Sequence, residues 1–189
     1  MRIMIRKIKV PQLETKRLIL RTWKKSDAKD LYSYAKNPAV GPRAGWKPHE
    51  SEAESRKIIG EVFLQNTVWA IVWKESGAVI GSVGFQEDKF RPGVHSMEMG
   101  YSLSEEFWGR GIMTEAALEV LDYGFEYMRL YIISITTGEE NTASRRVIEK
   151  CGFSYEGTLR KAYKVYDGSI RDIRCYSMFR DEYEKNRGK

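Results

Sequence analysis

A carboxylate in an apolar strand is the first feature of this chain that could do chemistry. Glu98 lies within the apolar segment 96–103, where charged residues are rare unless they have a partner or a function. In a strand it shares a face with Ser96 and Gly100, and burial would raise its pKa toward the range in which it could accept a proton. The alternative interpretation is a solvated Glu98 at the edge of a sheet.

A pair of glycines before a helix is the second feature. Gly109 and Gly111 flank Arg110 and are followed at once by good helix formers. Small residues at such a place let backbone N–H groups converge on an anion, and the helix adds its own unpaired N–H groups and the positive end of its dipole. The segment predicts a phosphate site built from main chain, although an ordinary strand-to-helix turn has the same pattern.

The third feature is a helix start that carries polar side chains on one face. Asn141, Ser144 and Arg145 lie at positions i, i+3 and i+4, so a helix brings them together. Asn141 could simply be the N-cap of that helix.

The glycine segment resembles the pyrophosphate loop of the GNAT superfamily of N-acetyltransferases, R/Q-x-x-G-x-G/A. Trp108, Gly111 and Met113 stand at its first, fourth and sixth places, and only the fourth matches. The run from Trp108 to Ala116, W-G-x-G-x-x-T-E-A, resembles the branch of ribosomal-protein alanine/serine N-acetyltransferases. That branch usually has a small residue where this chain has Met113.

A second motif of the same superfamily follows at the expected distance. The pattern N-x-x-S, E-K-x-G-F-x-x-E-G covers Asn141 to Gly157. The resemblance implies that Asn141 holds the pantetheine arm, that Ser144 donates a proton to the departing thiolate, and that Arg145 and Arg146 reach phosphates. The cofactor-binding residues implied by the resemblance are Met99, Tyr101, Leu103, Trp108, Gly109, Arg110, Gly111, Ile112, Met113, Thr114, Asn141, Ser144, Arg145 and Arg146.

The resemblance implies an N-acetyltransferase that moves an acetyl group from acetyl-coenzyme A (acetyl-CoA) to a primary amine by direct attack in a ternary complex. Glu98, within the E-x-G-Y pattern, would be the general base and Ser144 the acid, and a main-chain N–H near Met99 would stabilise the thioester oxygen. His95 is an alternative base, and Cys151 is expected to pack rather than to attack. Tyr101 could stack on substrate or fill the core.

The amine acceptor stays open: protein N-termini and small-molecule amines both fit, and so does association with the ribosome. Two other classes are a non-catalytic acyl-CoA-binding module and an RNA-associated protein. An intact phosphate site with a solvated Glu98 and a hydrogen-bonded Ser144 would favour the first. Basic residues clustered with exposed aromatic residues on one face would favour the second.

Periodicity, caps and turn residues predict the elements that position these groups. Ala117, Leu118, Leu121, Phe125 and Met128 should form one buried face of a helix over 111–128. The other helices are expected at about 27–36, from the Ser51-x-x-Glu54 capping box to Gln65, and at Asn141–Cys151. Strands are expected at Leu18–Thr22, Thr67–Trp73, Val79–Phe85, Ser96–Leu103 (interrupted by a bulge or close backbone approach at Gly100), Tyr131–Thr137, Ser154–Lys161 and Lys164–Phe179 (folding back at Asp167-Gly168).

The order of these elements predicts a mixed α/β single domain. With the resemblance, it implies a GNAT-like central sheet, mostly antiparallel, with a splayed strand pair that holds the cofactor. We expect a flexible basic segment 1–12, the catalytic domain at 13–182 and a polar tail at 183–189. The loop Ala39–Pro48, with Arg43 and Trp46, either connects elements or lines a substrate cleft.

Composition limits the classes of protein that remain. The 189 residues suit one domain, and 42% hydrophobic with 31% charged residues exclude a disordered or membrane chain. Two cysteines form neither a disulfide framework nor a metal-ligand spacing, so we expect a cytoplasmic, metal-free protein that is a monomer or homodimer and binds neither DNA nor membranes. The net charge of +6 suits an anionic cofactor and argues against a polyamine substrate.

Overall fold

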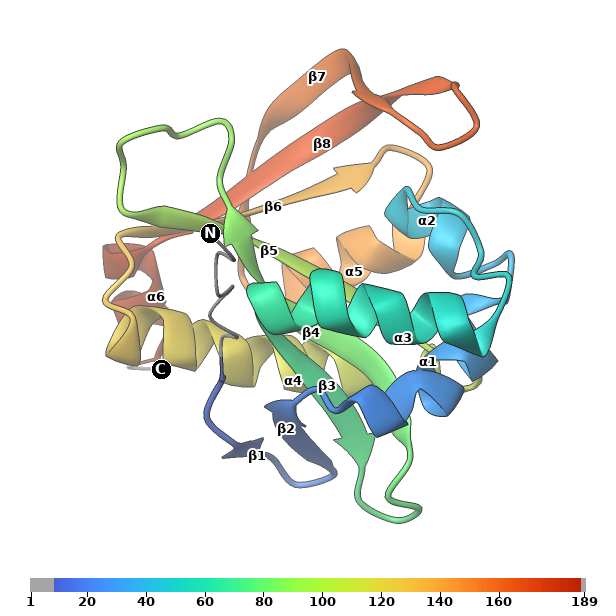
Figure 1. Ribbon diagram of the computed structural model, residues 1–189. Helices are drawn as coiled ribbons and strands as arrows, with labels where there is room; N and C mark the ends of the chain where they lie inside the picture. The colour runs from blue at the N-terminus through green and yellow to red at the C-terminus, as the bar shows by residue number, and fades with distance from the viewer. Residues whose placement is uncertain (1–8, 188–189) are drawn as a thin grey trace, which may run out of the picture.

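The fold is built on one mixed sheet. The computed structural model describes residues 9–187, so residues 1–8 of the expected basic segment and residues 188–189 of the expected tail lie outside it. The strands of the described chain follow the order β1-β2-β3-β4-β5-β6-β8-β7, and β5 with β6 is the parallel pair (Figure 1). They are β1 (Leu13–Glu14), β2 (Leu18–Thr22), β3 (Thr67–Trp73), β4 (Val79–Glu87), β5 (Ser96–Leu103), β6 (Ile132–Gly138), β7 (Ser154–Lys164) and β8 (Ile170–Phe179).

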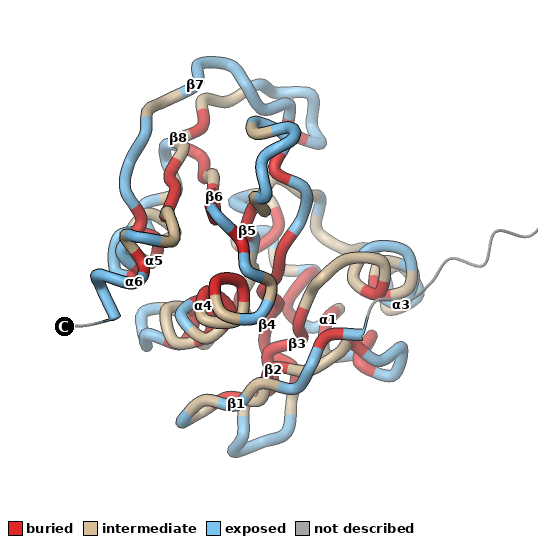
Figure 2. Tube along the Cα trace, turned by 90° about the vertical axis from the view of Figure 1, so that its left-hand side faces the viewer, coloured by how far each residue is buried: buried red, intermediate tan, exposed pale blue. Residues whose placement is uncertain are grey.

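Helices cover both faces of this sheet (Figures 1 and 2). They are α1 (Ala28–Ala35), α2 (Gly41–Ala44), α3 (Glu52–Glu61), α4 (Ile112–Asp122), α5 (Thr142–Lys150) and α6 (Arg180–Arg187). Figure 2 shows α1 and α3 on one side of β2–β4 and α4 on the other. Each side has its own hydrophobic cluster, one including Leu31, Ile59 and Val72, the other Phe85, Leu121 and Phe125. The predicted fold class is confirmed.

The parallel strands β5 and β6 separate partway along their length. Their pairing ends at Glu98 with Ser134, although β5 continues to Leu103 and β6 to Gly138. Figure 1 shows the two strands side by side at their starts and opening toward α2 and α5. The predicted splayed strand pair is therefore present, and it opens directly after the carboxylate of Glu98.

Gly100 does not interrupt β5. The β4–β5 register runs without a shift from Gly81 opposite Leu103 to Glu87 opposite Met97, with Gly84 opposite Gly100. A Cβ at Gly100 would meet no atom within 4 Å. The expected bulge or close backbone approach is therefore wrong, because this glycine faces the opening between the strands.

Helix α4 buries a different stripe from the one predicted. Its buried residues are Ile112, Met113, Ala116, Ala117, Val120 and Leu121. Leu118 is 44% exposed and Met128 only half-buried, so their assignment to the buried face is wrong, whereas those of Ala117, Leu121 and Phe125 are confirmed. The helix ends in a π-turn at Tyr123–Tyr127, which shifts the helical phase after Asp122.

Two short helices were not expected from the sequence. Helix α2 forms inside the segment Ala39–Pro48, and α6 follows β8 directly. Tyr183 of α6 is buried, stacks on Phe125 at 4.6 Å between ring centroids, and donates to Asp122 at 2.7 Å. Near the start of the described chain, the Trp69 indole donates to the Pro11 carbonyl at 2.8 Å.

Within the described residues, no helix combines the length and the apolar character needed to cross a bilayer.

Candidate active site

A glycine turn prepares the N-terminus of α4 for an anion. Gly109 and Gly111 both have φ of 71°, the left-handed region that favours glycine. Glu115 donates its N–H to the Gly111 carbonyl at 3.1 Å, so the amides of residues 112–114 precede the first intrahelical bond. A Cβ at Gly109 would meet nothing within 4 Å. Three amides at the start of α4 therefore have no acceptor within the helix, and open space lies beside Gly109.

The turn is held from behind by a side-chain clamp that the sequence did not indicate. Glu115 accepts hydrogen bonds from the Thr15 hydroxyl at 2.6 Å and from the backbone N and Nε of Arg17 at 2.9 and 2.7 Å. Arg17 also donates to the Arg110 carbonyl at 3.0 Å. Burial alone would raise the pKa of Glu115, but these hydrogen bonds and the Arg17 charge outweigh it, so its pKa lies below the ordinary range.

A cavity of about 300 Å³ opens in front of the glycine turn. Its walls come from the end of β5, the turn, the start of α4, α2 and α5. Of the predicted cofactor-binding residues it is lined by Tyr101, Leu103, Trp108, Gly109, Gly111, Ile112, Met113, Thr114, Asn141, Ser144 and Arg146. Lys150, one turn after Arg146 on α5, adds a second cation to the same wall. A mostly apolar cavity whose lining includes the glycine turn and two cations of α5 fits a phosphorylated ligand.

A second cavity, of about 350 Å³, contains Glu98. Glu98 is 9% exposed, and its carboxylate accepts from Gln86 Nε2 at 3.0 Å and from Thr136 Oγ1 at 2.6 Å. One donor comes from β4 and the other from β6, on the two sides of β5. The alternative of a solvated, edge-facing Glu98 does not fit this geometry.

The two cavities meet at a pair of hydroxyl groups. Tyr101 Oη lies 2.9 Å from Ser144 Oγ and also donates to the Ser144 carbonyl at 3.2 Å. Both residues, with Asn141, line both cavities. The Asn141 side chain accepts from Ser144 N at 3.2 Å, so it is the N-cap of α5, as the alternative interpretation predicted, and it still faces the cavities. Burial raises the pKa of Tyr101, so the phenol stays protonated.

Some predicted residues lie elsewhere. Arg110 turns back over the Phe107 and Trp73 rings, with its guanidinium carbon 5.2 and 5.4 Å from their centroids, and it lines neither cavity. Arg145 also lines neither. Met99 lines the Glu98 cavity rather than the cavity at the glycine turn.

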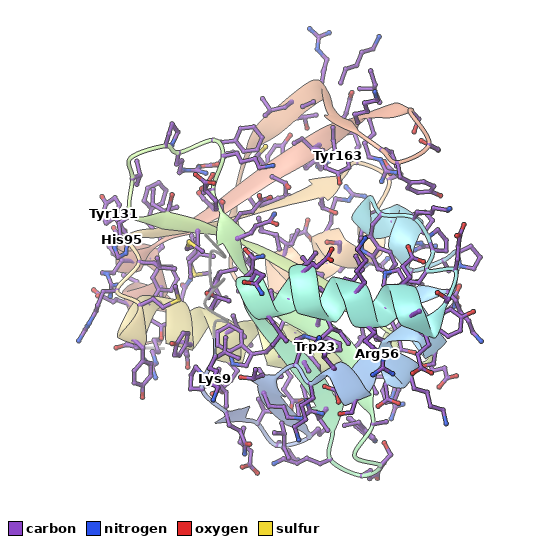
Figure 3. All side chains as sticks on the ribbon, in the orientation of Figure 1. Lys9, Trp23, Arg56, His95, Tyr131 and Tyr163 are labelled. Carbon is purple, nitrogen blue, oxygen red and sulfur yellow. The ribbon has the colours of Figure 1, made fainter. Side chains whose placement is uncertain are left out.

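The two residues considered as alternatives to the predicted catalytic groups do not reach the site. His95 is exposed beside Tyr131, on the side of the molecule away from Tyr163, which faces the opening (Figure 3). Cys151 is buried, and burial raises its pKa to about 12, so it is a thiol at neutral pH and a poor nucleophile. Its expected role in packing is confirmed by its place in the larger hydrophobic cluster.

Helix α2 forms part of the wall of both cavities, a role that the sequence predicted only in part. Arg43 and Ala44 line both cavities, and the Arg43 guanidinium lies 5.1 Å from the centroid of the Trp108 ring. Trp46 instead packs against the cluster formed by α1 and α3. Three contacts tie the segment to the other side of the opening: Asn141 Nδ2 donates to the Arg43 carbonyl at 3.4 Å, Arg171 donates to the Pro42 carbonyl at 3.1 Å, and Tyr163 packs against Gly45.

Known proteins share both the sequence pattern and the fold. An uncharacterized N-acetyltransferase, p20, of Bacillus licheniformis is 31% identical over 176 residues, which cover 90% of this chain and 97% of that protein. A GNAT-family acetyltransferase structure from Bacillus anthracis has a TM-score of 0.81 and 23% identity, covering 90% and 99% of the two chains. A ribosomal-protein-S5-alanine acetyltransferase structure from Vibrio fischeri has a TM-score of 0.74 and 26% identity, covering 91% and 98%. Residues 17–154 match the acetyltransferase (GNAT) domain family, to which this chain belongs.

Proposed function

We propose that this protein transfers an acetyl group from acetyl-CoA to a primary amine by direct attack in a ternary complex. The observation that carries the proposal is the junction of two cavities at Tyr101, Asn141 and Ser144: one cavity begins at main-chain anion donors, and the other contains a buried carboxylate. A phosphorylated thioester and an amine can therefore enter from different sides and meet at one point.

The residues divide the binding of acetyl-CoA between them. The amides of residues 112–114 would hold the pyrophosphate, with Arg146 and Lys150 beside it. Beyond Glu98, the edge of β5 that faces away from β4 pairs with no strand within residues 9–187, so the main-chain groups of residues 99–103 that face this edge are available to the pantetheine arm and to the thioester oxygen. Met113 is buried and forms part of the wall, and the main-chain donors remain accessible beside it.

Glu98 and the hydroxyl pair would handle the protons. Glu98 accepts a proton from the ammonium group, directly or through water, which leaves a neutral amine. The amine nitrogen forms a bond to the thioester carbonyl carbon, and the carbon–sulfur bond breaks. The nitrogen then loses a second proton; Ser144 gives its own proton to the departing thiolate and is reprotonated with the one that the nitrogen loses, so that amine and acetyl-CoA become an acetamide and free coenzyme A.

The alternative of a non-catalytic acyl-CoA-binding module fits less well. It would need a solvated Glu98, whereas this carboxylate is buried between two donors. Ser144 is hydrogen-bonded to Tyr101, which is one part of the expectation for a binding module that is met. An RNA contact is favoured by one observation: the β7–β8 hairpin carries Arg160, Lys161 and Lys164 near the exposed rings of Tyr163 and Tyr166.

Two similar proteins suggest different acceptors. Similarity to the ribosomal-protein-S5-alanine acetyltransferase fits a ribosomal acceptor. Similarity to a spermidine N(1)-acetyltransferase of Escherichia coli, 32% identical over 81 residues, fits a small amine.

The test is thiol release from acetyl-CoA with a panel of amines, together with two matched glycine variants. Gly111→Val and Gly77→Val both place a side chain at φ near 70°, where about 1–2 kcal/mol of backbone strain is expected. Gly77 lies in the β3–β4 turn, where an added Cβ would meet no atom within 4 Å, so it controls for that strain. We expect Gly111→Val to weaken acetyl-CoA binding by about tenfold or more and Gly77→Val to leave it unchanged. Equal affinities in both folded variants would remove the glycine turn from the site.

A further inference from the structure

The cavity that contains Glu98 is predominantly positive. Its lining includes the side chains of Arg43, Lys89 and Arg171, whereas Glu98 is its one carboxylate. That carboxylate already accepts two hydrogen bonds, from Gln86 and Thr136. A second or third ammonium group of a polyamine would meet cations here, and like charges in a partly enclosed site repel each other.

Two of the three cations have no carboxylate to balance them. Arg171 pairs with Glu140 at 3.2 Å and is further held by the Pro42 carbonyl. Among the described residues, neither Arg43 nor Lys89 has a carboxylate oxygen within 4.0 Å. Arg43 lies against the Trp108 ring at the junction of the cavities, and Lys89 follows β4 in the loop before β5. The positive charges of Arg43 and Lys89 are therefore available to an anionic ligand, because no carboxylate of the described residues pairs with them.

The lining also limits the size of what can bind. Tyr163 is 40% exposed and packs so closely against Gly45 that a Cβ there would collide with its ring. This contact joins β7 to the α2 segment across the cavity, and Phe90, Ala162 and Ile173 add apolar surface. A volume of about 350 Å³ is at the small end of the range for ligand sites, so it suits one or two amino-acid residues rather than a long chain.

We propose that the acceptor is a primary amine that carries an anionic group, such as a carboxylate, within a few bonds of its nitrogen. The inference rests on the proposed function and names its substrate class. The amine lies at Glu98, and the anionic group faces the two cations that have no carboxylate partner among the described residues, Arg43 and Lys89. A free amino acid and the N-terminus of a peptide with an acidic second residue share this chemistry.

Matched acceptors test the charge directly. The full-length protein is assayed by thiol release from acetyl-CoA with three tripeptide amides that begin with alanine and have Asp, Asn or Lys at the second position. Free alanine and alaninamide form a second pair, which separates an amino-acid acceptor from a peptide acceptor, and spermidine is the polycationic comparison. In at least one pair, Asp against Asn peptide or alanine against alaninamide, we expect kcat/KM for the acceptor with the carboxylate to be about tenfold higher than for its neutral partner. This ratio should fall as salt is added.

A charge-reversal pair assigns the preference to the cavity. Lys89→Glu should lower the ratio of acidic to neutral acceptor by about threefold or more while the KM for acetyl-CoA stays constant. Lys29→Glu makes the same change in net charge at an exposed position of α1, outside both cavities, and should leave the ratio unchanged.

Each contrary result has a distinct meaning. A wild-type ratio near one, spermidine as the best acceptor, or equal ratios in Lys89→Glu and the wild type would each overturn the inference and leave the proposed acetyl transfer standing. Binding of acetyl-CoA without acetylation of any acceptor in the panel would also overturn it, because both sources of the anionic amine are present. Failure to bind acetyl-CoA would instead overturn the proposed function.

Discussion

Glu98 accepts hydrogen bonds from both strands that flank β5, and both donors are neutral. Gln86 and Thr136 fix the carboxylate at the point where β5 and β6 separate, so it faces the cavity in one orientation. A neutral donor holds a carboxylate without supplying the compensating charge that an arginine would. This leaves Glu98 able to interact with an incoming ammonium group, which is the requirement for the proposed base.

Replacing Glu98 with glutamine tests that role. The amide can keep both hydrogen bonds, because the Thr136 hydroxyl can accept as well as donate. We expect kcat/KM near neutral pH to fall by about 10²-fold or more, with a smaller loss at high pH, where the free amine is already deprotonated. An α-amino acceptor has an ordinary pKa of about 7.7–8.0, so its defect would be smaller. Profiles measured from pH 6 to pH 9 that run parallel for the two proteins would exclude Glu98 as the base.

Tyr101 and Ser144 contact each other and should therefore act together. Tyr101 comes from β5 and Ser144 from α5, the helix that follows β6, so the pair bridges the opening between the two strands. The raised pKa of Tyr101 keeps its hydroxyl protonated, and its single proton can go either to the Ser144 carbonyl or to Ser144 Oγ. When it goes to Oγ, Ser144 is free to direct its own proton toward the thiolate.

A double-mutant cycle tests the pair. Ser144→Ala should lower kcat by about tenfold with little change in the affinity for acetyl-CoA, as expected for an interaction made mainly in the transition state. Tyr101→Phe should lower kcat less, and the double variant should lose less than the product of the two single losses, because hydrogen-bonded groups are not independent. Multiplicative losses would show that the two hydroxyls act separately, and unchanged turnover in Ser144→Ala would remove it from the mechanism.

At the scale of elements, the proposed phosphate site depends on the β1–β2 turn as much as on its own glycines. Thr15 and Arg17 hold Glu115 in the first turn of α4, and Arg17 also binds the carbonyl of Arg110 inside the glycine segment. An acidic side chain in the first turn of a helix is itself stabilising. The clamp orients the carbonyl of Arg110 toward Arg17, which leaves the amides that follow it free for a ligand.

The hydrogen bonds and ion pair of Glu115 predict how the free energy of unfolding depends on pH. The folded-state pKa of Glu115 is lowered, so its stabilising contribution is complete above the unfolded pKa of about 4.3 and is lost as the pH falls through the folded-state value. The free energy of unfolding of wild type minus Glu115→Gln should therefore be positive at pH 7 and shrink between about pH 5 and pH 3. Urea unfolding at a series of pH values measures it.

Glu119 on the same helix is the control with the opposite sign. Burial, aided by the Asp122 charge, raises its pKa, so its ionised form destabilises the fold above the unfolded pKa. Glu119→Gln should be as stable as wild type, or more so, at pH 7, and the difference should vanish in acid. A Glu115→Gln difference that is independent of pH would contradict the clamp.

At the scale of the whole molecule, the opening between β5 and β6 divides the sheet into two parts that other elements must join. One part holds β1–β5 and the other β6–β8. Arg91 ties the loop after β4 to the second part, through Asp88, which accepts from Ser134 of β6, and through Glu156 of β7. At the closed end, α6 returns from β8 to pack Tyr183 against α4 and its π-turn.

Tyr183→Ala tests how much the last helix contributes. The ring is 6% exposed and fills space against Phe125, so its removal should lower the free energy of unfolding by about 3 kcal/mol or more. Tyr166→Ala, in the exposed β7–β8 turn, should change it by less than about 0.5 kcal/mol. Chemical denaturation measures both free energies of unfolding. Similar values for wild type and Tyr183→Ala would show that the packing of α6 is dispensable.

Local signals in the sequence were sufficient for the elements that carry the chemistry. Alternation and turn residues predicted the β3–β4 hairpin, periodicity predicted α4, and Asn141 and Gly152 predicted both ends of α5. The glycine turn before α4 and the unusual carboxylate in β5 were also visible, because each depends on residues within one turn of helix or one strand. These short-range patterns, with the family resemblance, predicted the fold class.

Only the tertiary structure decided which side chains face the site and what charge it presents. Arg17 and Arg43 reach it from segments remote in sequence, whereas Arg110, inside the motif, turns back onto two aromatic rings. Leu118 has the right periodicity for burial, yet it is exposed because no other element in the described part of the chain covers that part of α4. The separation of β5 and β6 likewise depends on hydrogen bonds between residues far apart in the chain. Such contacts are decided by how whole elements pack, and local sequence patterns do not record that packing.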